Sequence, residues 1–258
     1  EIELQKLGSD ISVSSSLDSL NISVISLEKN IDATLDLLEE RLFKSQYEQA
    51  DVDRVRQQQI EGLEANKKQA SAIASDVYRK LLYGEGHPLA VSANGEKLTL
   101  ENISLEDVKE FSKLQLSANG LQVVVVGDIT ETEIIKKLQF LKRLSKDGFY
   151  EKKLPATPKL DETVLYFVDK PGAVQSEIRI GYMSDLTYNP TGEYFKRYLM
   201  NYVLGGAFSS RINLSLREDK GYTYGARSNF SGDKLSGRYP ASAEVRADET
   251  DKSIVEFV

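Results

Sequence analysis

The sequence predicts an α+β fold in which antiparallel-rich sheets are covered by helices. Three observations support this class. Apolar and polar residues alternate near the N-terminus, apolar residues then recur every three to four positions, and alternation returns near the C-terminus. The chain has 258 residues, of which 40% are hydrophobic, so it can bury a real core.

The N-terminal half starts with two Ser-rich alternating stretches, typical of half-buried antiparallel strands joined near Leu17–Ser19. The helical stripe that follows has capping residues before it and ends at Gly84. A continuous apolar run that ends at Gly127 predicts a buried strand. The expected elements are strands within 11–27, helices over 31–42, 51–83 and 104–114, a strand over 121–126 and a helix over 131–144.

The C-terminal half follows a stretch over 148–163 that carries Pro155 and Pro158 among charges and lacks periodicity, as in an interdomain linker. Gly205 and Gly206 interrupt its helical region, where we expect them to end a helix and allow close backbone approach. The expected elements are strands over 164–168 and 176–183, helices over 191–204 and 209–219, strands over 222–230 and 239–245 with a turn at 232–233, and a helix start at 248–251.

The two ends of the chain resemble each other. Each gives a helix end, a glycine (Gly8 or Gly221), two strands and a helix. Such self-similarity predicts a duplicated domain of about 210–220 residues, with both copies incomplete. The predicted organisation is therefore a closing part of a first domain over 1–147, a linker over 148–163, and an opening part of a second domain over 164–258.

Composition excludes several functions. With 33 Lys and Arg against 40 Asp and Glu, the net charge is −7, which argues against nucleic-acid binding. The chain has no Cys and one His, so it cannot form a thiolate site or a two-His zinc motif. No apolar run approaches the length of about 18 residues that suggests a membrane span. Since neither an initiator Met nor a secretory signal is visible, we expect a processed, tagged or truncated chain.

Three residues could take part in chemistry. His87 lies in a Gly/Pro turn, where we expect it to bond backbone groups rather than a metal. Arg217, at a helix end, and Tyr224, in the following strand, could share one concave surface and donate to a substrate carbonyl or its oxyanion. Alternatively, Arg217 pairs with an acid and Tyr224 fills the core.

The segment from Gly205 to Gly225, G-G-A-F-S-S-R-I-N-L-S-L-R-E-D-K-G-Y-T-Y-G, resembles the second-half signature of the pitrilysin-like zinc peptidases. This inverzincin family includes insulin-degrading enzyme and the mitochondrial processing peptidase. Residues 81–89, 103–108 and 123–128 resemble the closing half of a domain of the same family. The resemblance covers nearly the whole chain, and the family's duplicated domains would explain the internal similarity.

The resemblance implies the non-zinc half of such an enzyme. The family's H-x-x-E-H motif is absent, and the position of its third zinc ligand falls on Gly62, with Glu61 one residue away. We therefore expect no catalytic residue, metal ligand or cofactor in this chain. Arg217 and Tyr224 match the family's substrate-contacting pair, and Gly205 and Gly206 of the same signature join them as expected substrate-binding residues.

The expected function is a part in a zinc metalloendopeptidase system that holds peptide or unfolded polypeptide as an added strand on a sheet edge. A metal-bearing partner subunit, in a homo- or heterodimer, would hold the Zn²⁺ and hydrolyse the peptide, and this chain alone would be inactive. Bacterial relatives often divide the work in this way. The compartment stays open, and the resemblance to bacterial relatives weakly favours the cell envelope or periplasm. Two alternatives remain: a non-catalytic structural or assembly member of the family, and a simple peptide-binding module.

Overall fold

The computed structural model describes residues 1–16, 19–148, 154–159, 162–233 and 236–257, and it confirms the α+β class of helices and antiparallel strands. The chain folds into two compact units, 1–60 with 95–153 and 61–94 with 154–258. The prediction from the sequence places residues 61–94 in the first domain, whereas the division by contacts places them in the second unit. Parts of the predicted linker and of the turn near residues 17–19 lie outside the described residues.

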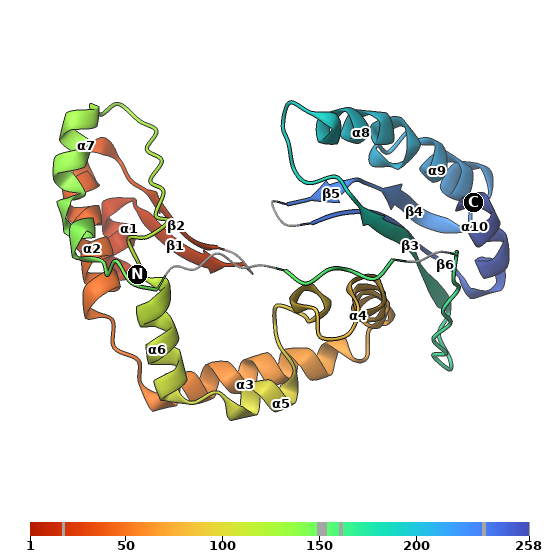
Figure 1. The fold of residues 1–258 in the computed structure, drawn as a ribbon, viewed down its shortest axis with the longest axis horizontal. Coiled ribbons are helices and arrows are strands. Elements are labelled where there is room, and N and C mark those ends of the chain that lie inside the picture. The colour runs from red at the N-terminus through yellow and green to blue at the C-terminus, as the bar shows by residue number, and fades with distance from the viewer. Residues whose placement is uncertain (17–18, 149–153, 160–161, 234–235, 258) are drawn as a thin grey trace. The chain divides into compact units, whose positions relative to one another are not determined.

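The N-terminal unit holds a two-stranded antiparallel sheet and a layer of helices (Figure 1). Leu4, Ile11, Leu35 and Leu38 form its buried core, while Val13 on the same hairpin is 56% exposed. The elements are α1 (Ile2–Leu7), β1 (Asp10–Ser15), β2 (Leu20–Ile25), η1 (Glu28–Asn30), α2 (Ile31–Lys44), the first part of α3 (Gln49–Asn66), α5 (Lys97–Asn102), α6 (Leu105–Gln115), α7 (Glu131–Lys137) and η3 (Gln139–Arg143).

The C-terminal unit is built on the sheet order β3-β6-β4, with the short β5 also paired to β6 and all pairs antiparallel. Its elements are the end of α3, α4 (Ala70–Tyr83), η2 (Pro88–Ala90), β3 (Gln175–Ser184), α8 (Glu193–Asn201), the π-helical η4 (Tyr202–Gly206), α9 (Arg211–Asn213), the π-helical η5 (Leu214–Asp219), β4 (Thr223–Ser228), β5 (Ser231–Gly232), β6 (Gly237–Arg246), η6 (Ala247–Glu249) and α10 (Thr250–Phe257).

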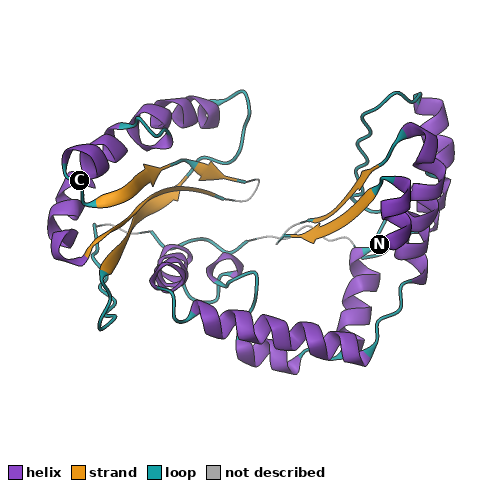
Figure 2. Ribbon diagram, turned by 180° about the vertical axis from the view of Figure 1, so that it is seen from behind, coloured by secondary structure: helices purple, strands orange, loops and turns teal. Residues whose placement is uncertain are grey.

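The two faces of this sheet differ in chemistry. Ala241, Ala243 and Val245 alternate along β6 on the face that α8, α9 and α10 cover (Figure 2). Leu216, completely buried, packs from η5 into the same core. The intervening residues of the strands face the other side, and α4 packs against β3. One face is therefore a hydrocarbon core, and the other is open to polar side chains.

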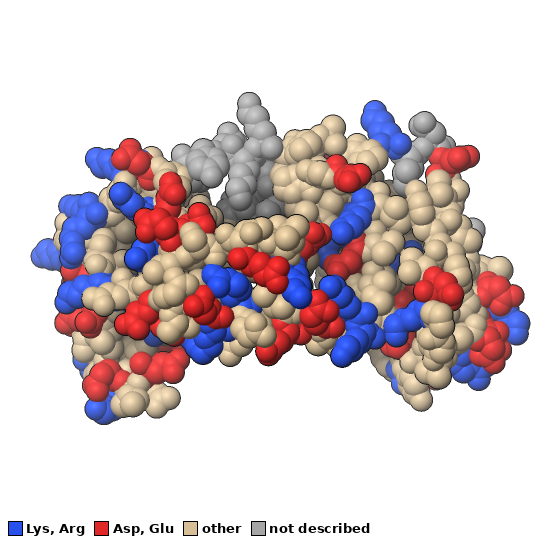
Figure 3. Space-filling model, turned by 90° about the horizontal axis from the view of Figure 1, so that it is seen from below, with Lys and Arg blue, Asp and Glu red and all other residues tan. Residues whose placement is uncertain are grey.

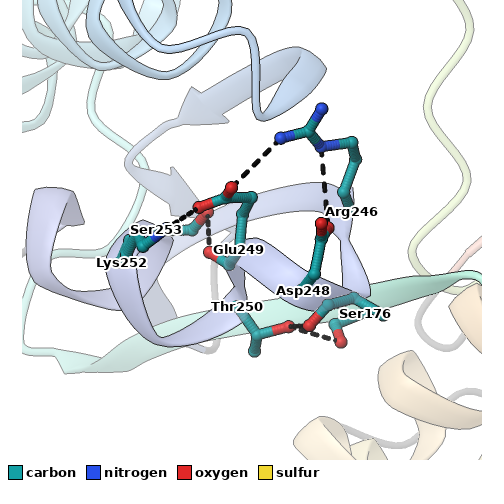
Figure 4. Close-up of polar contacts among 8 residues, drawn as sticks. Ser176, Arg246, Asp248, Glu249, Thr250, Lys252 and Ser253 are labelled. Carbon is teal, nitrogen blue, oxygen red and sulfur yellow. Dashed lines mark hydrogen bonds and ion pairs between the residues drawn. The ribbon is translucent and has the colours of Figure 1, made fainter.

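The start of α10 is tied to the sheet by a polar network (Figure 4). Thr250 donates a hydrogen bond of 2.7 Å to Ser176 of β3, and Ser253 donates one of 2.7 Å to the carbonyl of Glu249. The Glu249 carboxylate lies 3.1 Å from Arg246 and 2.7 Å from Lys252. Because these bonds join β3, β6 and the helix N-terminus, α10 has a fixed position over the end of the sheet.

Two predicted strands do not form. Residues 121–126 and 164–168 lie outside every strand, and their apolar side chains are exposed, to 94% at Val126 and 84% at Phe167. A strand exists only through a hydrogen-bonded ladder with a neighbour. No described residue pairs with either segment. An apolar run was therefore not enough to predict a strand at these positions.

Two helix predictions were also wrong in extent. The helix expected over 51–83 is divided into α3 and α4 by a turn after Asn66, where Lys67 to Gln69 bond back to the end of α3. The helix expected over 131–144 ends at Lys137 and continues as the 3₁₀ segment η3. Neither break carries Gly or Pro, so the sequence offered no signal for it.

The order of elements at the two ends agrees with the predicted similarity. A helix, a glycine with positive φ, antiparallel strands, a 3₁₀ turn and a helix occur in both places, with φ of 60° at Gly8 and 65° at Gly221. This agreement concerns local order, and the duplication itself stays a prediction.

On the face that Figure 3 draws, Lys and Arg side chains are interspersed with Asp and Glu. No helix in the described part of the chain is both long enough and apolar enough to cross a bilayer.

Leu216→Ala should destabilise the C-terminal unit by about 2–5 kcal/mol, because it removes a fully buried side chain and leaves a cavity. Leu214→Ala is the matched control: Leu214 lies in the same segment but is 41% exposed, so its loss should cost less than about 1 kcal/mol. Urea unfolding of the two variants measures the difference, and equal losses would contradict the assignment of Leu216 to the core.

Candidate functional site

The open face of the C-terminal sheet holds a pocket of about 360 Å³. It crosses all three long strands and reaches Ser71 at the start of α4. The charged and hydroxyl side chains that line it from the sheet are Glu177 and Arg179 of β3, Ser242 and Glu244 of β6, and Tyr224 and Arg227 of β4. This concave polar surface is the candidate binding site of the unit.

A bulge in β4 turns Tyr224 into this pocket. The pairing register with β6 shifts between Thr223 and Ala226. The Thr223 hydroxyl accepts a 3.0 Å hydrogen bond from the Gly225 N–H and lies 2.5 Å from the Glu244 carbonyl, which fixes the extra residues of the bulge. Bulges of this kind re-aim a side chain. Tyr224 is 89% exposed, so the alternative that it fills the core is wrong.

An ion pair anchors one side of the pocket. Arg179 donates to the Glu177 carboxylate at 2.7 Å and to the Ile178 carbonyl at 3.0 Å, and the side chains of the pair are largely shielded from solvent. Arg227 of β4 and Glu244 of β6 are exposed beside this pair. The pocket thus offers donors and acceptors for a polar chain.

Arg217 lies in η5, as expected for a helix end, but does not line this pocket. Its guanidinium lies 4.5 Å from the centre of the Phe208 ring and 3.3 Å from the Glu218 carboxylate. Since its side chain is 35% exposed, Arg217 keeps a solvent-facing part. The predicted pairing with an acid is present, and shared substrate contact by Arg217 and Tyr224 stays a prediction.

Gly205 lets a helix touch the sheet. A Cβ at this position would lie 2.1 Å from Ser228 Oγ and 2.6 Å from Ser228 N, so only glycine fits. The expected close backbone approach is confirmed there. At Gly206 the nearest atom, the Asn201 carbonyl oxygen, would be 3.3 Å away, a much looser contact. These contacts explain Gly205 structurally, while substrate binding by Gly205 and Gly206 stays a prediction.

Two buried asparagines that sequence reasoning missed join the helical layer to β4. Asn201 donates to the Ser228 carbonyl at 2.6 Å and accepts from the Ser228 hydroxyl at 2.7 Å. Asn213 accepts from the Ala226 N–H at 3.0 Å and donates to the Phe208 carbonyl at 2.6 Å. The signal available in the sequence was an asparagine on the inward side of each helix, which needs a buried hydrogen-bond partner. These bonds occupy backbone groups of β4 that a peptide strand would need.

His87 is a structural residue of its turn. It is 3% exposed, its Nδ1 accepts from the Leu89 N–H at 3.0 Å, and its Nε2 lies 3.2 Å from the Pro155 carbonyl. The ring stacks on Tyr83 at 5.2 Å between centroids. The expectation that His87 bonds backbone groups is confirmed. Among the described residues, no group of three His, Cys, Asp or Glu side chains is placed to hold a metal.

Tyr78 of α4 lies under the open face. Its hydroxyl is buried and has no hydrogen-bond partner among the described groups. Burial raises the pKa of Tyr78 to about 12, against a partial lowering by Arg238. Tyr78 therefore stays neutral at physiological pH.

The comparisons with known proteins agree with this architecture. A family model described as the Peptidase M16 inactive domain matches residues 102–258. The chain is 26% identical over 235 residues to the non-peptidase homolog YmxG of Helicobacter pylori, covering 88% of this chain and 52% of that protein. It is 24% identical over 214 residues to the uncharacterized zinc protease YmxG of Bacillus subtilis, covering 82% and 50%. The chain thus spans about half the length of these curated relatives.

Solved structures show the same fold. A peptidase M16 inactive domain from Pseudomonas fluorescens superposes with a TM-score of 0.86 at 21% identity, over 98% of this chain and 61% of that one. A protease from Helicobacter pylori superposes with a TM-score of 0.78 at 19% identity, over 98% and 62%. At these sequence identities, the similarity shows a shared fold and does not by itself indicate function.

Gly205→Ala should destabilise the C-terminal unit by about 1–3 kcal/mol, because the new methyl group overlaps Ser228 and forces the helical layer away from β4. Gly206→Ala should cost clearly less, since its neighbours need to move by only a few tenths of an ångström. Thermal unfolding of the two variants provides the comparison. A larger loss for Gly206→Ala would contradict this packing.

The raised pKa of Tyr78 predicts that the folding stability of the C-terminal unit falls at alkaline pH. The native phenol keeps its proton to about pH 12, whereas an unfolded tyrosine loses it near 10.0. By linkage, stability is lost as the pH rises through this window, because the native state binds more protons there. Tyr78→Phe should flatten the fall in urea midpoint between these pH values. Identical pH profiles of wild type and variant would exclude the effect.

Proposed function

Since this chain belongs to the Peptidase M16 inactive domain family, we propose that it supplies the substrate-binding half of a zinc metalloendopeptidase. A metal-bearing half, outside this chain, hydrolyses the peptide. Besides the relatives above, the chain is 21% identical over 180 residues, 70% of its length, to the mitochondrial-processing peptidase subunit beta of Neurospora crassa, of which it covers 36%. Because that protein is named as one subunit of a peptidase, it supports an enzyme whose work is divided between two halves.

The exposure of Tyr224 carries the proposal. A phenol that is 89% exposed in a polar pocket, and held there by a fixed bulge, gains little from packing and is free to bond a ligand. A phenolic O–H donates well to a peptide carbonyl and to the oxyanion that develops on it. In this proposal Tyr224 donates to the scissile carbonyl, and Arg217, which does not line the pocket, contacts the peptide outside it.

The peptide does not add to β4 beside Ala226 and Ser228, because Asn213 and Asn201 already bond backbone groups there. Strand addition needs a row of unpaired N–H and C=O groups. The peptide instead lies across the open face, where side chains of three strands can bond its backbone and its polar groups.

Zinc belongs to the other half. The described residues of this chain offer no set of ligands for it, so no step of the proposal passes through a metal held here. The contribution of this chain is to bind the peptide and to polarise its carbonyl.

A non-catalytic role within the same family is the second candidate. One curated relative is named a non-peptidase homolog, and the ion pair of Arg217 with Glu218 fits a residue that has only a structural task. In that case the pocket would have no part in turnover. A peptide-binding module without any hydrolytic partner is the third candidate, and it predicts binding by the lone chain with no cleavage in any mixture.

Tyr224→Phe and Arg217→Ala, each in the complete complex with a metal-bearing partner, should lower kcat by about 10²-fold, as expected for removal of an oxyanion donor. Cleavage of a flexible peptide in the presence of Zn²⁺ measures the effect. The chain without its partner should not cleave the peptide.

Matched controls separate site effects from general damage. Tyr166→Phe removes a hydroxyl from a tyrosine that is 52% exposed, and Arg211→Ala removes an exposed guanidinium from α9; neither residue lines the pocket. Both should keep full turnover. Unchanged turnover in the Tyr224 and Arg217 variants would favour the structural candidate, and cleavage by the lone chain would refute the division between halves.

A further inference from the structure

The charged side chains of the pocket on the open face are not all balanced within the chain. Glu177 and Arg179 neutralise each other at 2.7 Å, and only 9% and 21% of their side-chain surfaces are exposed. Arg227 also lines the pocket, but it is exposed, and its guanidinium has no ion pair or hydrogen bond within the described part of the chain. The pocket therefore holds one closed ion pair and one guanidinium that is available to a ligand.

The register of the sheet places a hydroxyl beside this guanidinium. Arg227 of β4 and Arg179 of β3 both pair with Ser242 of β6, so the three side chains form one row across the open face. Directly paired residues have Cβ atoms about 4.5–5.5 Å apart, which lets neighbouring side chains in the row bond one ligand group. Glu177 already bonds Arg179. Arg227 and Ser242 are therefore the members of this row that are left for a ligand.

The next row of the open face carries the opposite charge. It holds Glu244, two residues further along β6, which is exposed and lies opposite the bulge that contains Tyr224. Two residues of a strand span about 6.8 Å, so the two rows are distinct positions in the pocket. Glu244 repels an anion beside Tyr224, whereas a guanidinium and a hydroxyl both donate well to a carboxylate. A carboxylate is therefore favoured in the row of Arg227 and disfavoured in the row of Tyr224.

We propose that Arg227, with Ser242, selects peptides that carry a carboxylate away from the carbonyl that Tyr224 contacts. This selection rests on the proposed role of the pocket in peptide binding and adds the class of substrate. The carboxylate belongs to an Asp or Glu side chain or to the C-terminus of the peptide, and the two sources share the same chemistry. Arg227 is thus a specificity residue, while Tyr224 is the residue that contacts the reacting group.

Peptide binding to the lone chain, measured by isothermal titration calorimetry at neutral pH, tests the selection. The probes are the peptide Gly-Ser-Ala-Phe-Glu-Ala-Ser-Gly with both ends blocked, the same peptide with Gln in place of Glu, and the Gln peptide with a free C-terminus. The Glu peptide should bind about fivefold more tightly than the blocked Gln peptide, and NaCl at about 1 M should remove most of this preference. A gain for the free C-terminus in place of the Glu side chain would assign the carboxylate to the peptide terminus.

Variants identify the residue responsible. Arg227→Gln should bring the ratio of the two affinities close to one without weakening the blocked Gln peptide, and Arg227→Glu should reverse the preference. Because Arg227 is exposed, both variants should keep the wild-type circular dichroism. Arg211→Gln removes an exposed guanidinium outside the pocket and should keep the ratio, as should Glu244→Gln, since Glu244 does not bind the carboxylate. Equal binding of all three peptides, no binding of any, or a preference that survives Arg227→Gln would overturn the proposal.

The selection and the proposed function fail in different ways. If the preference depends on Arg227 but Tyr224→Phe leaves turnover of the complete complex unchanged, the selection stands and the proposed function is wrong. If Tyr224→Phe lowers turnover while the lone chain binds all three peptides equally, the proposed function stands and the selection is wrong.

Discussion

The contact between Asn201 and Ser228, with Gly205 beside it, is the constraint on which the C-terminal unit depends. Both residues are buried. The Asn201 side chain donates to the Ser228 carbonyl and accepts from the Ser228 hydroxyl, and the missing Cβ of Gly205 allows the helix to reach the strand. A buried polar pair that is fully satisfied fixes one arrangement, because any other leaves groups unpaired. The contact thus turns one side of α8 toward β4, and Leu204 of η4 packs against the core beside it.

The same contact decides what the edge of the sheet can do. Asn201 and Asn213 bond backbone groups of β4, so this edge is protected as natural edge strands usually are. The bulge at Thr223 then turns Tyr224 away from the edge and onto the open face. In the proposed mode of binding, side chains of the pocket rather than the backbone of β4 bond the peptide.

Elements that depend on local chemistry were predicted well from the sequence. Elements that depend on pairing with a segment distant in sequence were predicted poorly. The helix end at Arg217, the glycine turn and the strand of Tyr224 follow from spacing and from Gly221. The run at 121–126 has the composition of a strand, yet strand identity needs a ladder that no described residue provides. The helix predicted over 191–204 is present as α8 and the start of η4, but hydropathy alone does not identify which side faces the sheet, because Asn201, a polar residue, makes that contact.

The pocket and the helical layer of α8 to α10 lie on opposite faces of one sheet. Residues of the pocket alternate along β3 and β6 with buried ones such as Ile178 and Val245, and the helical layer packs on the buried side. A substitution in the core such as Leu216→Ala therefore acts on stability, whereas Tyr224→Phe removes a hydroxyl from the open face and leaves that core intact.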